Sequence, residues 1–117
     1  MISLRSDTCI WLVAGVTDMR RSFNGLGEQI QNFLDDNPHS GHIFIFCGHK
    51  GDMVKGLWAD RDGMNLYIKR LEEGHFACPS ALDGKISLTR SQLALLLERF
   101  DWRQPIRQKR NNPLNML

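Results

Sequence analysis

Asp60 and Asp62 form an Asp-x-Asp pair, a combination that could bind a hard divalent cation. The pair lies in the stretch DRDG, and Asp is also common in turns because its side chain bonds to nearby backbone N–H groups. No motif ties a third carboxylate to the pair, so the turn is the favoured interpretation. The sequence has no Gly-x-Ser-x-Gly, P-loop or Gly-x-Gly-x-x-Gly motif. We therefore predict a domain that is not an enzyme and uses no cofactor.

Two cysteine–histidine pairs could in principle supply a tetrahedral zinc site. Cys47 and His49 flank one expected strand, and His75 and Cys78 flank another. Their spacings differ from those of common zinc modules, so no metal site is predicted, and the favoured interpretation is core cysteines and turn histidines. The three cysteines of the chain are isolated and odd in number. This argues against a disulfide framework and is typical of a reducing cytosol.

Two adjacent arginines occupy an unusual place. Arg20 and Arg21 follow Thr17 and Asp18, which are expected to begin a helix. The N-terminal end of a helix disfavours cations. The arginines could form an anion site with the free backbone N–H groups there and fork onto phosphate oxygens. Alternatively, Asp18 balances Arg21 and both arginines face water. The sequence leaves both hypotheses open.

Other cations accompany the expected sheet and the end of the chain. Basic groups on a sheet with nearby aromatic residues could follow a nucleic-acid backbone, but the favoured interpretation from these residues alone is a solvated surface. Residues 103–117 carry a charge of +4 and no acid, which leaves −2 for residues 1–102 within the total of +2. The candidate residues for binding DNA or a protein partner are Arg20, Arg21, Lys50, Lys55, Lys69, Arg70, Arg103, Arg107, Lys109 and Arg110.

Apolar patterning predicts one α+β domain over residues 1–103 and a basic, flexible tail over 104–117. Amphipathic helices are expected at about 18–34 and 90–100, the second with a capping box at Thr89 and Gln92. The order of elements predicts an antiparallel β-meander sheet, with the N-terminal and C-terminal helices packed on one of its faces. Strands are expected at 9–14, 42–47, 53–59, 64–71, 75–79 and 84–89.

The hydropathy pattern predicts a cytoplasmic protein without a membrane segment. The start, MISLRSDTCI, has no apolar run long enough for a signal peptide. No stretch approaches the ~18 apolar residues that a membrane-spanning helix needs. The apolar fraction of 42% is enough for a core of its own.

Three segments carry a family resemblance: IWLVAGVTDMRRSFNGL (10–26), GHIFIFCGHKGDMVKGLWADRDGMNLYIKRLEEGHF (41–76) and SLTRSQLALLLERFDWR (87–103). Together they resemble the accessory protein of the insertion-sequence 66 family, the TnpB-type product of the second open reading frame. The likeness runs from about Ile2 to Arg103. The motifs that make it specific are Gly15-Val16-Thr17-Asp18-Met19-Arg20, Trp58 with Asp60 and Asp62-Gly63, Lys69-Arg70-Leu71-Glu72, and Asp101-Trp102-Arg103.

The sequence departs from the family pattern at three places. Cys47-Gly48-His49 stands where members usually carry arginines, which weakens the case that this hairpin grips phosphate. Cys78 replaces a usual aromatic residue, and Gly27 replaces a better helix former.

The resemblance implies a role in DNA transposition, beside a separate and larger transposase that holds the catalytic carboxylates. We therefore expect a non-catalytic accessory protein that contacts DNA, the transposase or both, and that has no small-molecule substrate. One alternative is a protein–protein adaptor without DNA affinity, and another is a small metal-dependent nuclease that uses Asp60 and Asp62. Salt-dependent DNA binding separates the first two, and metal-dependent nicking tests the third.

Overall fold

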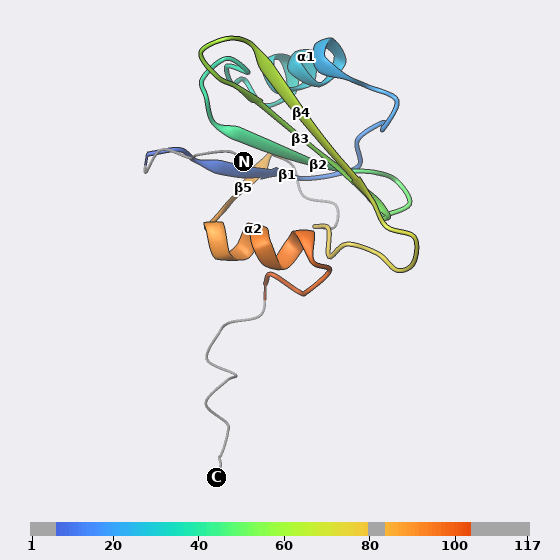
Figure 1. Cartoon of the computed structure of the whole chain (residues 1–117). Coiled ribbons are helices and arrows are strands. Elements are labelled where there is room, and N and C mark those ends of the chain that lie inside the picture. The colour runs from blue at the N-terminus through green and yellow to red at the C-terminus, as the bar shows by residue number, and fades with distance from the viewer. Residues whose placement is uncertain (1–6, 80–83, 104–117) are drawn as a thin grey trace.

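The computed structural model describes residues 7–79 and 84–103, which form an α+β fold (Figure 1). The predicted tail over 104–117, with Arg107, Lys109 and Arg110, lies outside the described residues. The elements in chain order are β1 (Ile10–Val13), α1 (Phe23–Phe33), β2 (Ile43–Cys47), β3 (Met53–Ala59), β4 (Met64–Arg70), β5 (Lys85–Leu88) and α2 (Arg90–Leu97).

The strands form one five-stranded mixed sheet in the order β4-β3-β2-β1-β5. The strands β2, β3 and β4 are antiparallel neighbours joined by short connections, as the sequence predicts. The prediction of a purely antiparallel sheet is wrong, because β1 pairs with β2 in parallel, with Ile10 opposite Ile43. Parallel neighbours need a crossover, and α1 provides it between these two strands. At the far edge, β5 returns antiparallel to β1.

The strand expected at 75–79 does not form. These residues run as a loop in which Phe76 N donates to Gly51 O at 2.8 Å and Cys78 N donates to Phe76 O at 2.9 Å. The second bond closes a tight local turn and takes the Cys78 N–H away from any ladder. Pro79 has no N–H to donate to a ladder either. The chain therefore passes the sheet without extending it.

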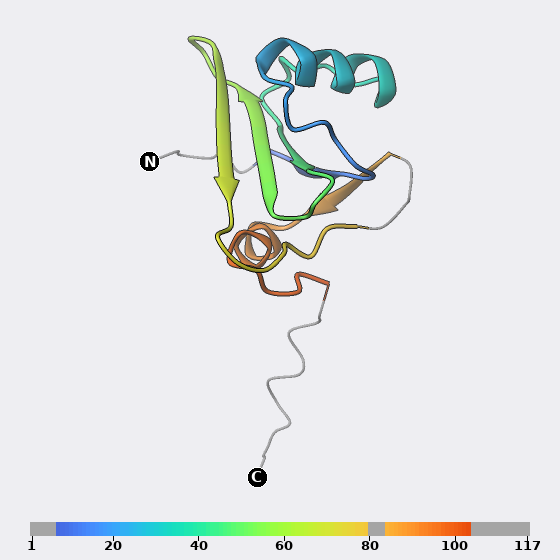
Figure 2. The same ribbon diagram turned by 90° about the vertical axis from the view of Figure 1, so that its right-hand side faces the viewer.

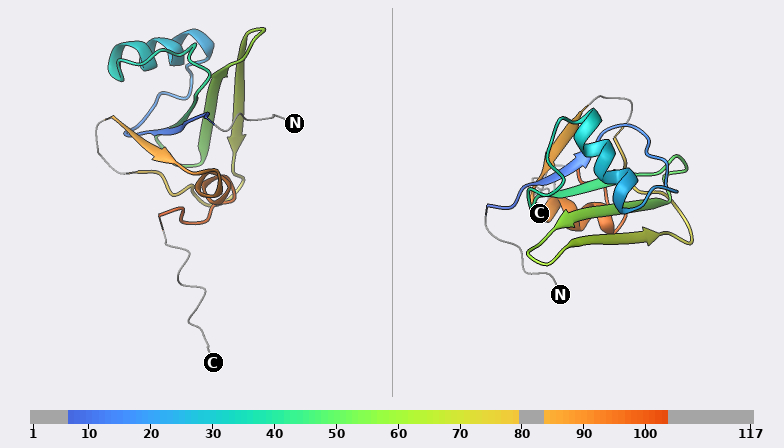
Figure 3. Two further views of the ribbon diagram at one scale, coloured as in Figure 1. Left: turned by 90° about the vertical axis from the view of Figure 1, so that its left-hand side faces the viewer. Right: turned by 90° about the horizontal axis from the view of Figure 1, so that it is seen from above.

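The two helices cover opposite faces of the sheet (Figure 2; Figure 3), so the prediction that both cover one face is wrong. The reason lies in β2, whose five residues IFIFC are all buried. A strand buried on both faces is continuously apolar, and alternate side chains enter different layers. The layer with α2 contains Ile10, Leu12, Ile43, Ile45, Cys47, Val54, Phe76, Leu88, Leu96 and Trp102. The layer with α1 contains Val13, Leu26, Ile30, Phe44, Phe46 and Leu57.

Both helices are shorter than the periodicity predicts. The first begins at Phe23 after an N-cap residue, Ser22, that makes no side-chain capping bond. Its apolar stripe is only partly covered, since Phe23 is 45% and Phe33 76% exposed. The second ends at Leu97, and Arg99 soon after has a left-handed φ of 68°, which no helix continues through.

The start of α2 matches its prediction in detail. Thr89 Oγ1 accepts from Gln92 N at 3.0 Å, and Gln92 Oε1 accepts from Thr89 N at 2.8 Å, which confirms the capping box. Among the described residues, no helix has the length and apolar character to cross a membrane.

Candidate nucleic-acid interface

The loop between β1 and α1 is organised by the Asp18 carboxylate. Asp18 Oδ1 accepts from Arg20 N at 2.9 Å, and Asp18 Oδ2 accepts from Arg20 Nη2 at 2.8 Å. Arg21 N also donates to Asp18 O at 3.0 Å, which closes a turn at the place where a helix was expected. The hydrogen bonds from Arg20 lower the pKa of Asp18 to about 2.

This turn changes the expected position of the arginine pair. Arg20 and Arg21 precede α1 and do not lie in its first turn. The salt-bridge partner of Asp18 is Arg20, and Arg21 has only a minor influence on the carboxylate. In this Asx turn the Asp18 carboxylate accepts hydrogen bonds from Arg20, two residues along the chain. This local arrangement competes with helical structure at these residues.

Arg21 is half-buried and joins a partly buried polar chain. Its Nη1 donates to Gln29 Oε1 at 3.0 Å, and Gln29 Nε2 donates to Thr17 Oγ1 at 3.0 Å. Thr17 is 2% exposed, and its backbone N donates to Cys47 O at 2.9 Å. The arginine stem lies on Gly25, where a Cβ would come within 3.1 Å of Arg21 Cβ and Cγ. Arg21 therefore ties the loop to both α1 and the end of β2.

Two of the candidate lysines are engaged inside the domain. Lys55 is 7% exposed, and its Nζ donates to Arg21 O at 2.7 Å. Lys69 Nζ donates to Leu97 O at 2.7 Å, at the C-terminal end of α2 where carbonyl groups lack helical partners. Both ammonium groups hold neighbouring elements together.

Arg20, Lys50 and Arg70 border one open hollow of about 670 Å³ at the end of the sheet where β2 and β4 finish. We call it the basic hollow. Three separate segments supply these cations: the β1–α1 loop, the β2–β3 loop and the last residue of β4. The rest of its lining is Val16, Thr17, Asp18, Met19, Gly48, His49, Asp52 and Met53.

The electrostatics of the basic hollow favour an anion only modestly. Three cations face two carboxylates, Asp18 and Asp52, so the formal charges of these five side chains sum to one positive charge. All three cationic side chains are exposed, and that of Arg20 is 91% exposed. The pairing with Asp18 holds the Arg20 guanidinium in a defined orientation at the rim. Guanidinium groups held in this way suit the oxygens of a phosphate.

Arg103 lies elsewhere. Its Nε donates to Asp101 Oδ1 at 3.1 Å, and its guanidinium carbon lies 5.6 Å from the ring centroid of Trp102. Trp102 belongs to the core layer beneath α2, so Arg103 is separate from the residues that line the basic hollow. Of the seven predicted cations that lie in the described residues, the structure thus brings three together at the basic hollow.

The Asp60 carboxylate is occupied by its own turn. Its Oδ1 accepts from Asp62 N at 2.9 Å and Gly63 N at 3.0 Å, and its Oδ2 accepts from Asn65 Nδ2 at 2.8 Å. These bonds, that from Asn65 first, lower the pKa of Asp60. The turn interpretation of the pair is confirmed. Within the described part of the chain, no three His, Cys, Asp or Glu side chains are placed to hold a metal ion.

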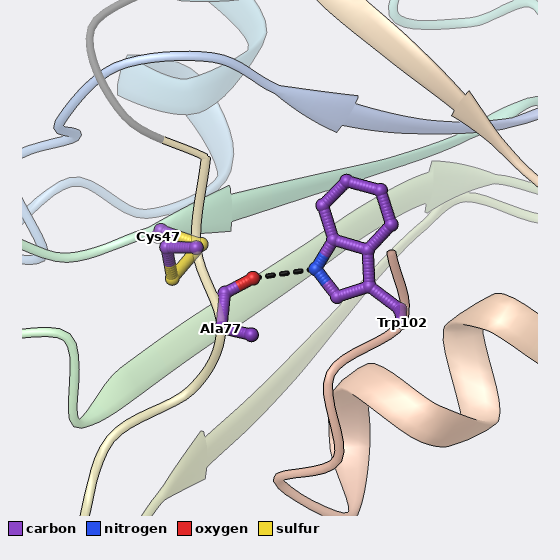
Figure 4. Close-up of a disulfide and its surroundings, with 4 residues drawn as sticks. Cys47, Ala77 and Trp102 are labelled. Carbon is purple, nitrogen blue, oxygen red and sulfur yellow. Dashed lines mark hydrogen bonds between the residues drawn. A yellow bond between two sulfur atoms is a disulfide. The ribbon is translucent and has the colours of Figure 1, made fainter. Parts of the chain in front are cut away.

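Cys47 and Cys78 form a disulfide, so the expectation of unpaired cysteines is wrong for these two, while Cys9 is a free thiol (Figure 4). A separation of 31 residues hides this pairing in the sequence, because only the fold places the loop after β4 beside the end of β2. The bridge also removes both thiolates from the hypothetical zinc site. His49 and His75 nevertheless line one shallow pocket.

The chain has relatives of similar length. The family model that matches it is described as "IS66 Orf2 like protein" and covers residues 8–107. Uncharacterized protein y4hO of Sinorhizobium fredii is 42% identical over 96 residues, which are 82% of this chain and 84% of that protein. Uncharacterized protein y4jC of the same organism is 33% identical over 95 residues, 78% of this chain and 81% of that protein. No solved structure gives a significant match.

Proposed function

The chain belongs to the IS66 Orf2-like family, whose members are accessory proteins of insertion sequences, and we propose that it supports transposition by binding DNA phosphates at the basic hollow. The observation that carries the proposal is the convergence of Arg20, Lys50 and Arg70 on one open site. Protein contacts to DNA are made largely to phosphate and sugar, and such contacts position a protein without specifying a sequence.

The exposure of the three side chains supports this role. Arg20 and Arg70 carry planar guanidinium groups that can each donate two parallel bonds to one phosphate, and Lys50 adds a compact charge. The bonds between Arg20 and Asp18 are exposed, so an arriving phosphate can compete for the guanidinium in water. Lys55 and Lys69 are already bonded to backbone carbonyls and add nothing to this surface.

A salt titration tests the proposal. The triple variant Arg20→Ala, Lys50→Ala and Arg70→Ala is compared with the wild type by fluorescence anisotropy on a labelled duplex. If all three side chains neutralise phosphates, the slope of log affinity against log salt falls in magnitude by ~2.7, at ~0.9 per contact.

A charge-matched control separates a site from a general effect of charge. Arg61 is exposed in the turn before β4, and Arg70 is the last residue of that strand. Arg61→Ala and Arg70→Ala therefore remove the same charge, one at each end of β4. We expect only Arg70→Ala to change the slope. Equal effects of the two variants would contradict a site at the basic hollow.

One observation favours contact with the transposase as a second candidate. Among the strands of the described residues, β4 lies at one edge of the sheet and pairs with β3 alone. It carries two exposed apolar side chains, with Tyr67 40% and Ile68 51% exposed. An edge strand of this kind can accept a further strand from another protein. The test is capture of the transposase of the same element by the wild type and by Ile68→Lys, with and without terminal-repeat DNA. If the wild type captures the transposase without DNA and Ile68→Lys does not, the adaptor role is established. If Ile68→Lys captures the transposase as well as the wild type does, the β4 edge is not the contact surface.

A further inference from the structure

We propose that Cys47 and Cys78 form a thiol–disulfide exchange site, which small-molecule thiols and disulfides reduce and oxidise reversibly in the folded protein. The bridge joins the last residue of β2 to the loop after β4 (Figure 4). The two Cα atoms are 6.2 Å apart, within the range of ~4.4–6.8 Å that ordinary disulfides span. This inference goes beyond the proposed function and does not depend on it.

The loop that carries Cys78 has anchors other than the bridge. Phe76 is 4% exposed in the core, and its N donates to Gly51 O at 2.8 Å. The indole N–H of Trp102 donates to Ala77 O, the residue beside Cys78 (Figure 4). These contacts remain when the bridge is reduced. They hold the two thiols opposite each other, so the bridge can close again without refolding.

The two sulfur-bearing residues differ in access. Cys47 is 1% exposed, whereas Cys78 is half-buried in a stretch without regular secondary structure. A small thiolate therefore attacks the Cys78 sulfur, forms a mixed disulfide there and releases Cys47. A second thiol then frees Cys78. Overall, one protein disulfide and two small thiols give two protein thiols and one small disulfide, and the two thiol protons pass to Cys47 and Cys78.

The oxidised bridge restrains the β2–β3 loop. Cys47 directly precedes this loop, and Gly51 within it accepts the bond from Phe76, so oxidation ties the loop to the segment beneath it at a second point. The bridge closes a loop of about 31 residues and so reduces the conformational entropy of the unfolded chain. This lowers the equilibrium constant for unfolding by up to about 500-fold. We expect a corresponding slowing of amide exchange in both segments.

The test compares full-length protein equilibrated with oxidised or with reduced glutathione, without denaturant. Maleimide labelling and mass spectrometry should find one reactive thiol, Cys9, in the oxidised form and three in the reduced form. In the reduced form, Cys78 should react before Cys47. Urea unfolding should give an unfolding constant lower by about 10- to 500-fold in the oxidised form.

Two variants are matched. Cys78→Ser should have the stability of the reduced wild type in either glutathione buffer, while Cys9→Ser should keep the whole redox-dependent difference. The wild-type comparison decides the question even if Cys78→Ser does not fold. Three labelled thiols in the oxidised form, a bridge to Cys9, reduction that requires unfolding, or equal stability of the two forms would each overturn the proposal.

Discussion

Replacing Lys55 should destabilise the fold and leave DNA binding intact, whereas replacing Lys50 should do the reverse. The Lys55→Ala variant loses a hydrogen bond from a charged donor, which contributes ~1.5–3 kcal/mol, and three methylenes at ~0.8 kcal/mol each. Burying the ammonium group costs free energy in the wild type, and the variant avoids this cost. The avoided cost offsets several kcal/mol of the stability lost with the hydrogen bond and the methylenes. We expect a net loss of about 2 kcal/mol and a Tm lower by roughly 10 °C.

Urea unfolding, run beside anisotropy on a duplex at several salt concentrations, measures both quantities. Lys55→Met keeps most of the stem and removes the ammonium, so it should lose less stability than Lys55→Ala. Lys50 is exposed, and Lys50→Ala should change stability by no more than ~0.5 kcal/mol while lowering the salt slope by ~0.9. A Lys55→Ala protein with wild-type stability and a reduced salt slope would refute the assignment of Lys55 to the interior.

Three further predictions concern Asp18, Asp60 and residues 104–117. The pKa of Asp18 is about 2 in the folded protein, below its ordinary value of 3.8, so its stabilising effect is present above pH ~4 and is lost as the pH falls towards 2. In Arg20→Ala, NMR titration should show this pKa returning towards 3.8. Asp60→Asn should alter the β3–β4 turn without removing a chemical step. If the wild type nicks supercoiled DNA with magnesium and Asp60→Asn does not, the prediction of a non-catalytic protein is wrong. Deleting residues 104–117 should lower the salt slope by ~2.7 if Arg107, Lys109 and Arg110 all contact phosphate, and an unchanged slope would show that they do not.

Local sequence patterns predicted local structure well. The short turns between β2, β3 and β4 favour antiparallel neighbours, and the structure has them. Thr89 and Gln92 mark the start of α2 because a capping box needs only residues three apart. The parallel pairing of β1 with β2 and the placement of the helices on opposite faces were missed. Both depend on where the chain returns to the sheet after α1. A short stretch of sequence carries no information about such a long-range pairing.

The same limit applies to the candidate site. Lys50 and Lys55 look alike in the sequence, but the alternation along β3 directs Lys55 beneath the β1–α1 loop while Lys50 stays in an exposed turn. The cysteine pair was hidden because its partners lie 31 residues apart, and Cys78 lies in a loop where a strand was expected. In contrast, the turn role of Asp60 was predictable, since all of its hydrogen-bond partners lie within five residues.

The two adjacent arginines have different tasks, which explains why a chain places them together. After the Asp18 turn, Arg20 is exposed and lines the basic hollow, while Arg21 is half-buried and bonds to Gln29 on α1. A variant that removes both arginines therefore mixes a loss of binding with a loss of structure.

Arg20→Ala alone should weaken DNA binding and leave the fold stable, because an exposed salt bridge contributes little to folding. Arg21→Ala alone should destabilise the protein, because it leaves Gln29 Oε1 without that donor. If instead Arg21→Ala folds as stably as the wild type and loses DNA affinity, the division of tasks is wrong and Arg21 belongs to the interface.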